Sequence, residues 1–452
     1  MRLVALAPLL AALASVQTVL GATGYTHNPP KLERRDKFKS TNPQVTVQGS
    51  TCTVEPLGGG QDDGPNLLYA FNLCGSQALI DLPGYYTVNT VLRTTLNSVE
   101  IRLGGAISYV PDITYWNASS IYLTYQNATT YWFFEGHDVT FHGGGTITAN
   151  GQLWWDIFAQ SQNKGVAGGS STTFARPVPL TVGNSSNVVV EDLSIIDSPF
   201  WHNFVYQSTN VDYTRIKIKS ISANASAPAS NTDGWDIYRS SYVSITNSHV
   251  VNGDDCVSFK PNSTYMTVEN MNCNTTARVS LTFYIIIWFT PDAADIAAAD
   301  IVANVFVRNI TMSNAQNGAR IKVFGGSNDT HSVSGGGSGY VKNVTFQDFT
   351  NINVDNPIYL TQCYSSSTQQ CQQHPATLQI SEVHYIDVTG TTSGLVANGT
   401  VATLECSAEC YNITATGTHL TPKNGTAKYL CANIADESAL DFPCTDVPIT
   451  KG

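Results

Sequence analysis

Two short acidic clusters contain the residues of this sequence that are best suited to chemistry. The first is NTDGWD (residues 231–236) and the second is NGDDC (residues 252–256), in a chain of which only 13% of the residues are charged. Carboxylates held close together repel, so the pKa of one should rise while that of another stays low. Such a split provides the acid and the base that glycoside hydrolysis requires.

The spacing of the clusters favours a shared site. In a regular strand Asp254 and Asp255 would point to opposite faces, but Gly253 allows a bulge or a turn that lets both carboxylates line one groove. The clusters lie about 20 residues apart, close to one coil of a solenoid, so they should stack on neighbouring coils. The alternative is that they are ordinary Asx-rich turns; two clusters at coil spacing favour function.

Two cations occur in the stretch ARIKVF. Arg320 and Lys322 are two residues apart, which places them on one side of a strand. Beside a trio of acids, such a pair suits a substrate with its own carboxylate, because an arginine can hold that group bidentately. An ordinary solvated pair is the alternative for these two residues taken alone.

Repeated short strands must position these residues. They are rich in β-branched and aromatic residues, the first three begin about one coil or a small multiple apart, and Asn, Ser, Gly and Asp mark the corners. Helical patterns are nearly absent after the N-terminal segment. The pattern predicts an all-β fold, a single-stranded right-handed parallel β-helix, whereas a β-sandwich would space its strands about 8–12 residues apart. The clearest strands are at residues 188–195, 243–246, 266–269, 305–311 and 344–349.

The N-terminus is typical of an exported protein. Residues 1–21 have a charged start, an apolar run and small residues at the end, so they are predicted to be a cleaved signal peptide. Residues 22–50 are expected to be a mobile lead-in, and residues 51–450 the β-helix. We therefore predict a secreted, extracellular glycoprotein rather than a membrane-anchored one. Its candidate glycosylation sites are Asn117, Asn127, Asn184, Asn224, Asn262, Asn274, Asn309, Asn328, Asn343, Asn398, Asn412 and Asn424.

The cysteine count agrees with export, because ten cysteines in an exported chain indicate disulfides. No Cys/His spacing matches a zinc site. Proximity along the chain suggests sequential pairing. The ten candidates are Cys52, Cys74, Cys256, Cys273, Cys363, Cys371, Cys406, Cys410, Cys431 and Cys444.

Charge excludes one class of partner. The net charge is −11, so nucleic acid is not an expected partner of the chain. No membrane partner is expected, and we expect a monomer.

The ordered motifs NTDGWD, GDDC and RIK resemble those of glycoside hydrolase family 28, the polygalacturonases, whose fold is a right-handed parallel β-helix. The stretches SPFWHNFV (residues 198–205) and GGGTITANGQLWWD (residues 143–156) extend the resemblance, the first of them to the exo-acting fungal branch. The resemblance covers roughly residues 45–445.

The resemblance implies inverting hydrolysis of α-1,4-linked galacturonic acid in pectin. Asp254 matches the general acid, and Asp233 and Asp255 match the pair that activates water. The remaining matches are to substrate-binding residues, and no metal or organic cofactor is implied. These matches are Arg320, Lys322, Asn231 and the cleft tyrosine Tyr364.

One segment departs from the family. Members carry a Gly-His-Gly-type segment after the cysteine that follows GDDC, yet no histidine occurs between His249 and His331. Residues 275–300 stand there instead, with an apolar run at 284–289 that is far shorter than the roughly 20 residues needed to cross a membrane. The run either substitutes as a strand of the β-helix or disrupts it. We interpret the segment as translated non-coding sequence and expect impaired catalysis unless His202 or another histidine compensates.

Other functions fit the same residues. A rhamnogalacturonan or xylogalacturonan hydrolase would use the same acids, and a pectate lyase shares the solenoid. A non-catalytic pectin-binding β-helix would explain the missing histidine, although the retained acids oppose it.

Overall fold

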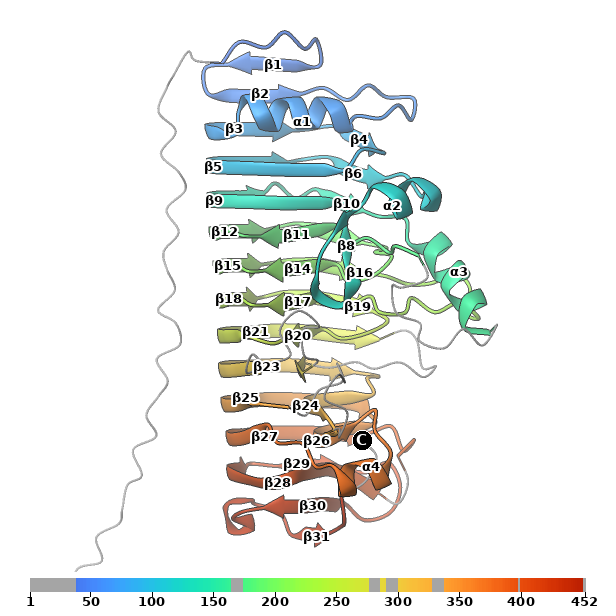
Figure 1. Ribbon diagram of the computed structural model, residues 1–452, viewed down its shortest axis with the longest axis vertical. Helices are drawn as coiled ribbons and strands as arrows, with labels where there is room; N and C mark the ends of the chain where they lie inside the picture. Colours follow the sequence, from blue (N-terminus) through green and yellow to red (C-terminus); the bar gives the residue numbers. More distant parts are fainter. Residues whose placement is uncertain are drawn as a thin grey trace, which may run out of the picture.

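The computed structural model describes residues 38–163, 174–275, 285–289, 300–326, 337–396 and 399–449. Their strands form one large sheet that is parallel apart from the pairing of β1 with β2, and the strands stack as successive rungs along the long axis of the molecule (Figure 1). The hairpin of β7 and β8 lies outside this sheet. A parallel β-helix, as predicted, is therefore the fold of the chain.

The elements are short and closely spaced along the chain. The helical segments are α1 (Gly64–Leu73), α2 (Ile113–Ser119), η1 (Tyr125–Asn127), α3 (Gln152–Asn163), α4 (Thr368–Gln373) and η3 (Glu437–Ala439). The strands are β1 (Val45–Gln48), β2 (Thr51–Val54), β3 (Ser76–Leu82), β4 (Tyr85–Val88), β5 (Leu92–Leu103), β6 (Ala106–Tyr109), β7 (Ile121–Tyr122), β8 (Thr129–Thr130), β9 (Trp132–His142), β10 (Thr146–Thr148), β11 (Leu180–Gly183), β12 (Ser186–Glu191), β13 (Ser194–Ile196), β14 (Asn203–Tyr206), β15 (Thr209–Thr214), β16 (Lys217–Lys219), β17 (Trp235–Tyr238), β18 (Ser241–Thr246), β19 (His249–Asn252), β20 (Val257–Phe259), β21 (Ser263–Thr275), β22 (Ile285–Phe289), β23 (Asp300–Ser313), β24 (Asn317–Phe324), β25 (Gly339–Val354), β26 (Asn356–Tyr364), β27 (Gln379–Thr392), β28 (Thr400–Thr416), β29 (His419–Thr421), β30 (Lys428–Ile434) and β31 (Cys444–Asp446).

Alternation of side chains within each strand builds the core. Val188, Val211, Val243 and Met266 follow one another in register from β12 to β21, and all four are buried. Because successive residues of a strand point to opposite faces, each coil places every second side chain inside. Each of the five predicted strand stretches lies mainly within strands of this stack.

Asparagines stabilise the corners between strands. Asn247, Asn270 and Asn309 each have a left-handed backbone, with φ of 51°, 57° and 54°. The amide of Asn309 donates to Asn270 Oδ1 at 2.7 Å, and Asn270 donates to Asn247 Oδ1 at 3.1 Å. Asparagine tolerates this conformation and bonds to its own kind one coil away, which explains why it marks the corners in the sequence.

The helices were not predicted. Leu67, Ala70 and Phe71 of α1 are buried in the main core. The helix contacts β2, β4 and β5 near the N-terminal end of the stack (Figure 1). The helix has only 10 residues, so its apolar stripe is too short to stand out beside the strand pattern.

Two predicted segments fall partly outside the described residues. The expected signal peptide at 1–21 lies outside them, and β1 begins at Val45, inside the expected lead-in. Of residues 276–299, only 285–289 are described, as β22, which pairs in parallel with β20 and β24. The apolar run therefore substitutes as a strand of the β-helix. In the part of the chain that the structure describes, no helix is long and apolar enough to span a membrane.

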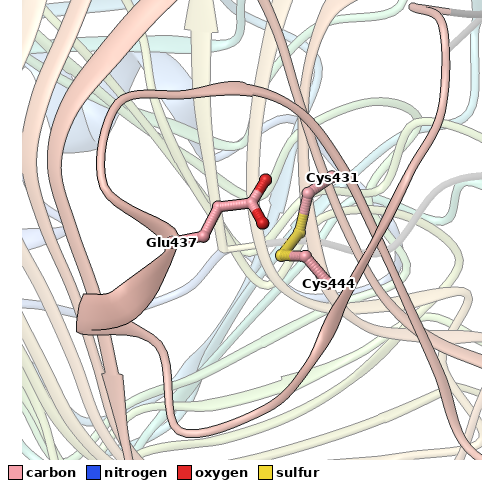
Figure 2. A group of neighbouring side chains, drawn as sticks. All are labelled: Cys431, Glu437 and Cys444. Carbon is pink, nitrogen blue, oxygen red and sulfur yellow. A yellow bond between two sulfur atoms is a disulfide. The ribbon is translucent and has the colours of Figure 1, made fainter.

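Sequential pairing of the cysteines is confirmed. The disulfides join Cys52–Cys74, Cys256–Cys273, Cys363–Cys371, Cys406–Cys410 and Cys431–Cys444. Figure 2 shows the last of these beside the Glu437 side chain. Cys431, Glu437 and Cys444 lie close enough to resemble a metal site, but both sulfurs are used in the disulfide, so the two cysteines offer no thiolate to a metal.

Candidate active site

The site lies on the outward face of the sheet that contains β14, β17, β20, β22, β24 and β26. Asp236, Ser258 and Arg320 occupy equivalent positions in β17, β20 and β24, with Ile286 of β22 between the last two. Their chain neighbours, such as Ile237, belong to the core. Because side chains alternate along a strand, Asp236 and Arg320 point away from the core.

The three predicted acids come together. Asp233 precedes β17, while Asp254 and Asp255 lie in the bend between β19 and β20. One carboxylate oxygen from each lies within 4.8 Å of the others. Asp233 and Asp254 are 3% and 4% exposed, and Asp255 is fully buried. The predicted stacking of the two clusters on neighbouring coils is confirmed by the register of Trp235 with Val257.

Glycine and threonine hold the two clusters together. The backbone at Gly253 passes so close to the preceding coil that a Cβ there would lie 2.0 Å from the carbonyl oxygen of Ala229. The Gly253 N–H donates to Thr232 Oγ1 at 2.8 Å, and the Asn252 amide donates to the Thr232 carbonyl at 2.7 Å. Gly253 is thus needed for a close approach of two coils.

Burial dominates the electrostatics of two of the three acids. Burial is the main cause that raises the pKa of Asp233 and of Asp255 well above the usual value, with neighbouring carboxylates adding to it. Lys322 opposes the rise at Asp255. Neither oxygen of Asp255 has a hydrogen-bond partner within the described residues, and nor does Oδ1 of Asp233. Buried polar atoms without partners indicate groups reserved for a ligand or for water.

A buried ion pair beside the acids was missed. Lys260 Nζ lies 2.6 Å from Asp236 Oδ1, and both side chains are at most 1% exposed. The ammonium also lies 4.9 Å from the ring centroid of Trp201. Burial raises the pKa of Asp236 to about 7, against the opposing effect of Lys260. The second Asp of NTDGWD and a lysine directly after a strand were the available signals.

The predicted cations lie on the same face. Arg320 and Lys322 are 3% and 1% exposed, so an ordinary solvated pair is the wrong interpretation. The Arg320 guanidinium lies 4.7 Å from the ring centroid of Tyr359 and 5.2 Å from that of Tyr364, and Lys322 Nζ lies 4.6 Å from the Tyr364 ring. Burial lowers the pKa of Lys322 well below its usual value, with Asp255 opposing the change.

Asn231 lies between a missed arginine and an acid. Arg176 is buried and its Nη2 donates to Asn231 Oδ1 at 2.8 Å, while Asn231 Nδ2 donates to Asp254 Oδ2 at 3.2 Å. Arg176 and Asn231 are 55 positions apart in the sequence, so no local pattern could have identified the arginine.

His202 is fully buried and anchors the backbone beside the acids. Its Nδ1 lies 2.9 Å from the Asp233 carbonyl oxygen and its Nε2 lies 2.9 Å from Ser220 Oγ. Since a carbonyl only accepts, Nδ1 donates the proton. Burial lowers the pKa of His202 to about 4. Both ring nitrogens are thus occupied, and neither is available to a carboxylate.

A β-helix with three clustered carboxylates beside two buried cations has the groups that a glycoside hydrolase needs. The model of the family described as "Glycosyl hydrolases family 28" matches residues 94–440. The chain is 39% identical over 412 residues to a probable exopolygalacturonase X of Aspergillus terreus, covering 89% of this chain and 90% of that protein. It is 37% identical to an exopolygalacturonase of Cochliobolus carbonum, covering 86% and 85%. The chain belongs to glycosyl hydrolase family 28.

Solved structures agree with the fold. An endo-xylogalacturonan hydrolase from Aspergillus tubingensis superposes with a TM-score of 0.76 at 29% identity, covering 89% of this chain and 100% of that one. A polygalacturonase from Erwinia carotovora superposes with a TM-score of 0.63 at 17% identity, covering 88% and 99%. The parallel β-helix is therefore right-handed, as predicted.

Proposed function

We propose that the protein hydrolyses α-1,4-linked galacturonic acid residues from the chain ends of pectin. The proposal rests mainly on the trio Asp233, Asp254 and Asp255, which lies on one face with Arg320 and Lys322. The exopolygalacturonase relatives support the choice of substrate.

The acids divide between them the two proton transfers of one displacement. Asp254 in its protonated form donates a proton to the oxygen of the leaving sugar, while Asp233 and Asp255 position the attacking water and one of them, in its ionised form, accepts its proton. One proton is given and one is taken, so exchange with solvent restores the site.

The oxygens lie within 4.8 Å, nearer than the about 6.5–9.5 Å typical of inverting enzymes, so inversion is a separate point to test. Proton NMR of the first product anomer tests it directly.

The two cations bind the carboxylate of the substrate. Arg320 and Lys322 are held against the Tyr364 ring. Tyr364 thereby limits the positions that the cations can adopt. A charge-assisted hydrogen bond to such a fixed cation contributes about 1.5–3 kcal/mol. A galacturonate chain offers one carboxylate per sugar, which suits this pair.

One end of the sheet face is covered, which supports cleavage from chain ends. The segment from β7 to β8 lies against β14 and β17, where the Tyr125 ring stacks on Tyr238 with centroids 4.1 Å apart. Thr124 Oγ1 also lies 3.1 Å from Tyr206 Oη. A polysaccharide that passed Asp236 along this face would meet the segment, and this supports access by the end of a chain.

The test is digestion of polygalacturonate by the purified protein, followed by reducing-sugar measurement and product analysis. Release of monomer from the start supports the proposal, whereas early oligomers would overturn exo action. Absence of any product would indicate a non-catalytic pectin-binding protein, and an unsaturated product that absorbs in the ultraviolet would indicate a lyase.

A second candidate is hydrolysis of xylogalacturonan, favoured by the TM-score of 0.76 to an enzyme with that substrate. Digestion of xylose-substituted and unsubstituted galacturonan side by side distinguishes the two.

Because the family histidine is missing, we expect slow turnover: misplacement of a reacting group by about 1 Å can cost about a hundredfold in rate.

Export and monomeric state belong to the same proposal. Mass spectrometry of the culture supernatant tests cleavage near residue 21 and glycan attachment, and size-exclusion chromatography tests the oligomeric state.

A further inference from the structure

Arg176 is a buried cation behind the acid cluster. Its guanidinium lies 4.0 Å from the ring centroid of Phe158 and 4.7 Å from that of Phe200. Its Nη1 donates to the Ser230 carbonyl at 3.1 Å, and its Nη2 donates to Asn231 Oδ1 at 2.8 Å. Two rings and two hydrogen bonds therefore fix the position of the planar group.

The arginine fixes the direction of the Asn231 amide. A guanidinium has donors only, so it must face the amide oxygen, and this leaves the NH2 group for the other side. That group donates to Asp254 Oδ2 at 3.2 Å. The backbone of Asn231 is left-handed, with φ of 58°, a conformation that asparagine tolerates better than most residues.

The second oxygen of Asp254 is held separately. Asp254 Oδ1 accepts from the Asp255 backbone N–H at 3.0 Å. With Asn231 at one oxygen and the backbone at the other, both ends of the carboxylate have a fixed donor. If the Asn231 amide turned over, its oxygen would face the carboxylate instead, and the two would repel.

We propose that Arg176 is a positioning residue for catalysis, which acts through the Asn231 amide to orient the Asp254 carboxylate. This inference rests on the proposed function, because it assumes that Asp254 is the general acid. It changes the expected role of Asn231 from substrate binding to the support of Asp254.

The experiment compares Arg176→Lys, Arg176→Met, Asn231→Ala and the double variant Arg176→Lys/Asn231→Ala. Arg215→Lys is the matched control, because that arginine is half-exposed and pairs with Glu191 and Asp192 away from the acids. We expect kcat to fall about 10- to 100-fold in each single variant at Arg176 or Asn231, with KM nearly unchanged. The double variant should be no slower than Asn231→Ala alone, since the residues act in series.

Three kinetic results would overturn the inference. One is unchanged kcat in Arg176→Lys. Another is a rise in KM with kcat preserved, which would return Asn231 to substrate binding. The third is a double variant whose losses multiply, which would show independent roles.

A measurement without substrate keeps the test separate from the proposed function. Infrared difference spectroscopy follows the protonated carboxyl band of Asp254, assigned with Asp254→Asn. Losing the Asn231 donor or the Arg176 charge disfavours the ionised form, so the titration midpoint should move to higher pH in Arg176→Met and Asn231→Ala. An unmoved midpoint contradicts the inference even if the wild type proves inactive. None of the other titratable or charged residues of the site is substituted in these variants. These residues are Asp233, Asp236, Asp255, Lys260, Lys322, Arg320 and Tyr364.

Discussion

Replacement of Lys260 by methionine should reveal how strongly the buried ion pair supports the site. The substitution keeps the volume of the side chain but leaves the Asp236 carboxylate buried without its partner at 2.6 Å. Breaking a buried pair from one side costs about 3–5 kcal/mol in the free energy of unfolding. The double variant Lys260→Met/Asp236→Asn removes both charges and should recover most of that loss.

The effect should depend on pH. The pKa of Asp236 is raised to about 7 from 3.8, so the stability that this group contributes is present below 3.8 and is lost as pH rises through 7. Near pH 4.5 Asp236 is protonated and needs no cation, whereas near pH 7.5 it is ionised. The loss in Lys260→Met should therefore be small at pH 4.5 and appear only as pH rises through 7, growing above that point by at most about 1.4 kcal/mol per pH unit.

Urea unfolding followed by tryptophan fluorescence measures the loss at both pH values, and Trp201 beside Lys260 serves as a local reporter. Lys219→Met, at an exposed lysine of β16, is the control and should change little at either pH. The reasoning is refuted if Lys260→Met is as stable as the wild type at pH 7.5, or if the double variant is no more stable than the single one.

Three further outcomes are expected. Asp254→Asn should lower kcat about 10²- to 10⁴-fold with unchanged circular dichroism; a loss below tenfold would exclude it as the general acid. Arg320→Lys should lower kcat/KM on polygalacturonate about tenfold or more, and less on methyl-esterified chains; equal losses would show that it does not bind the carboxylate. Tyr125→Ala should add oligomers to the products because it loosens the cover at Tyr238; a monomer-only profile would place the obstruction elsewhere.

The repeated strands could be predicted because each depends on a local pattern. Residues 305–311 are rich in residues that favour β structure and lie in β23, where Val305 and Val307 are buried. Asn309 marks a corner because it bonds to Asn270 one coil away. The proximity of Asp233 to Asp254 followed from coil spacing alone. For these features the spacing along the sequence equals the length of one coil or a small multiple of it.

The features that were missed depend on contacts between distant segments. Arg176 reaches Asn231 only through the folding of the chain around the acids, and Lys260 is recognisable only once Asp236 lies beside it. The raised pKa of both Asp233 and Asp255 has the same origin, because burial by distant segments is its main cause and the neighbouring carboxylates raise it further.

The strand β22 meets the requirements of the β-helix fold, although its segment lacks the histidine expected for catalysis. Ile285 and Ile286 lie in register between Val257–Ser258 of β20 and Ala319–Arg320 of β24, so the ladder of backbone hydrogen bonds is continuous. That ladder requires only residues that favour β structure, which an Ile-rich run provides whatever its origin. The resemblance to the family leads us to expect a histidine near this strand as well, and the sequence has none between His249 and His331. The segment can therefore preserve the β-helix and the alignment of Arg320 with the acids while slowing the reaction that they perform.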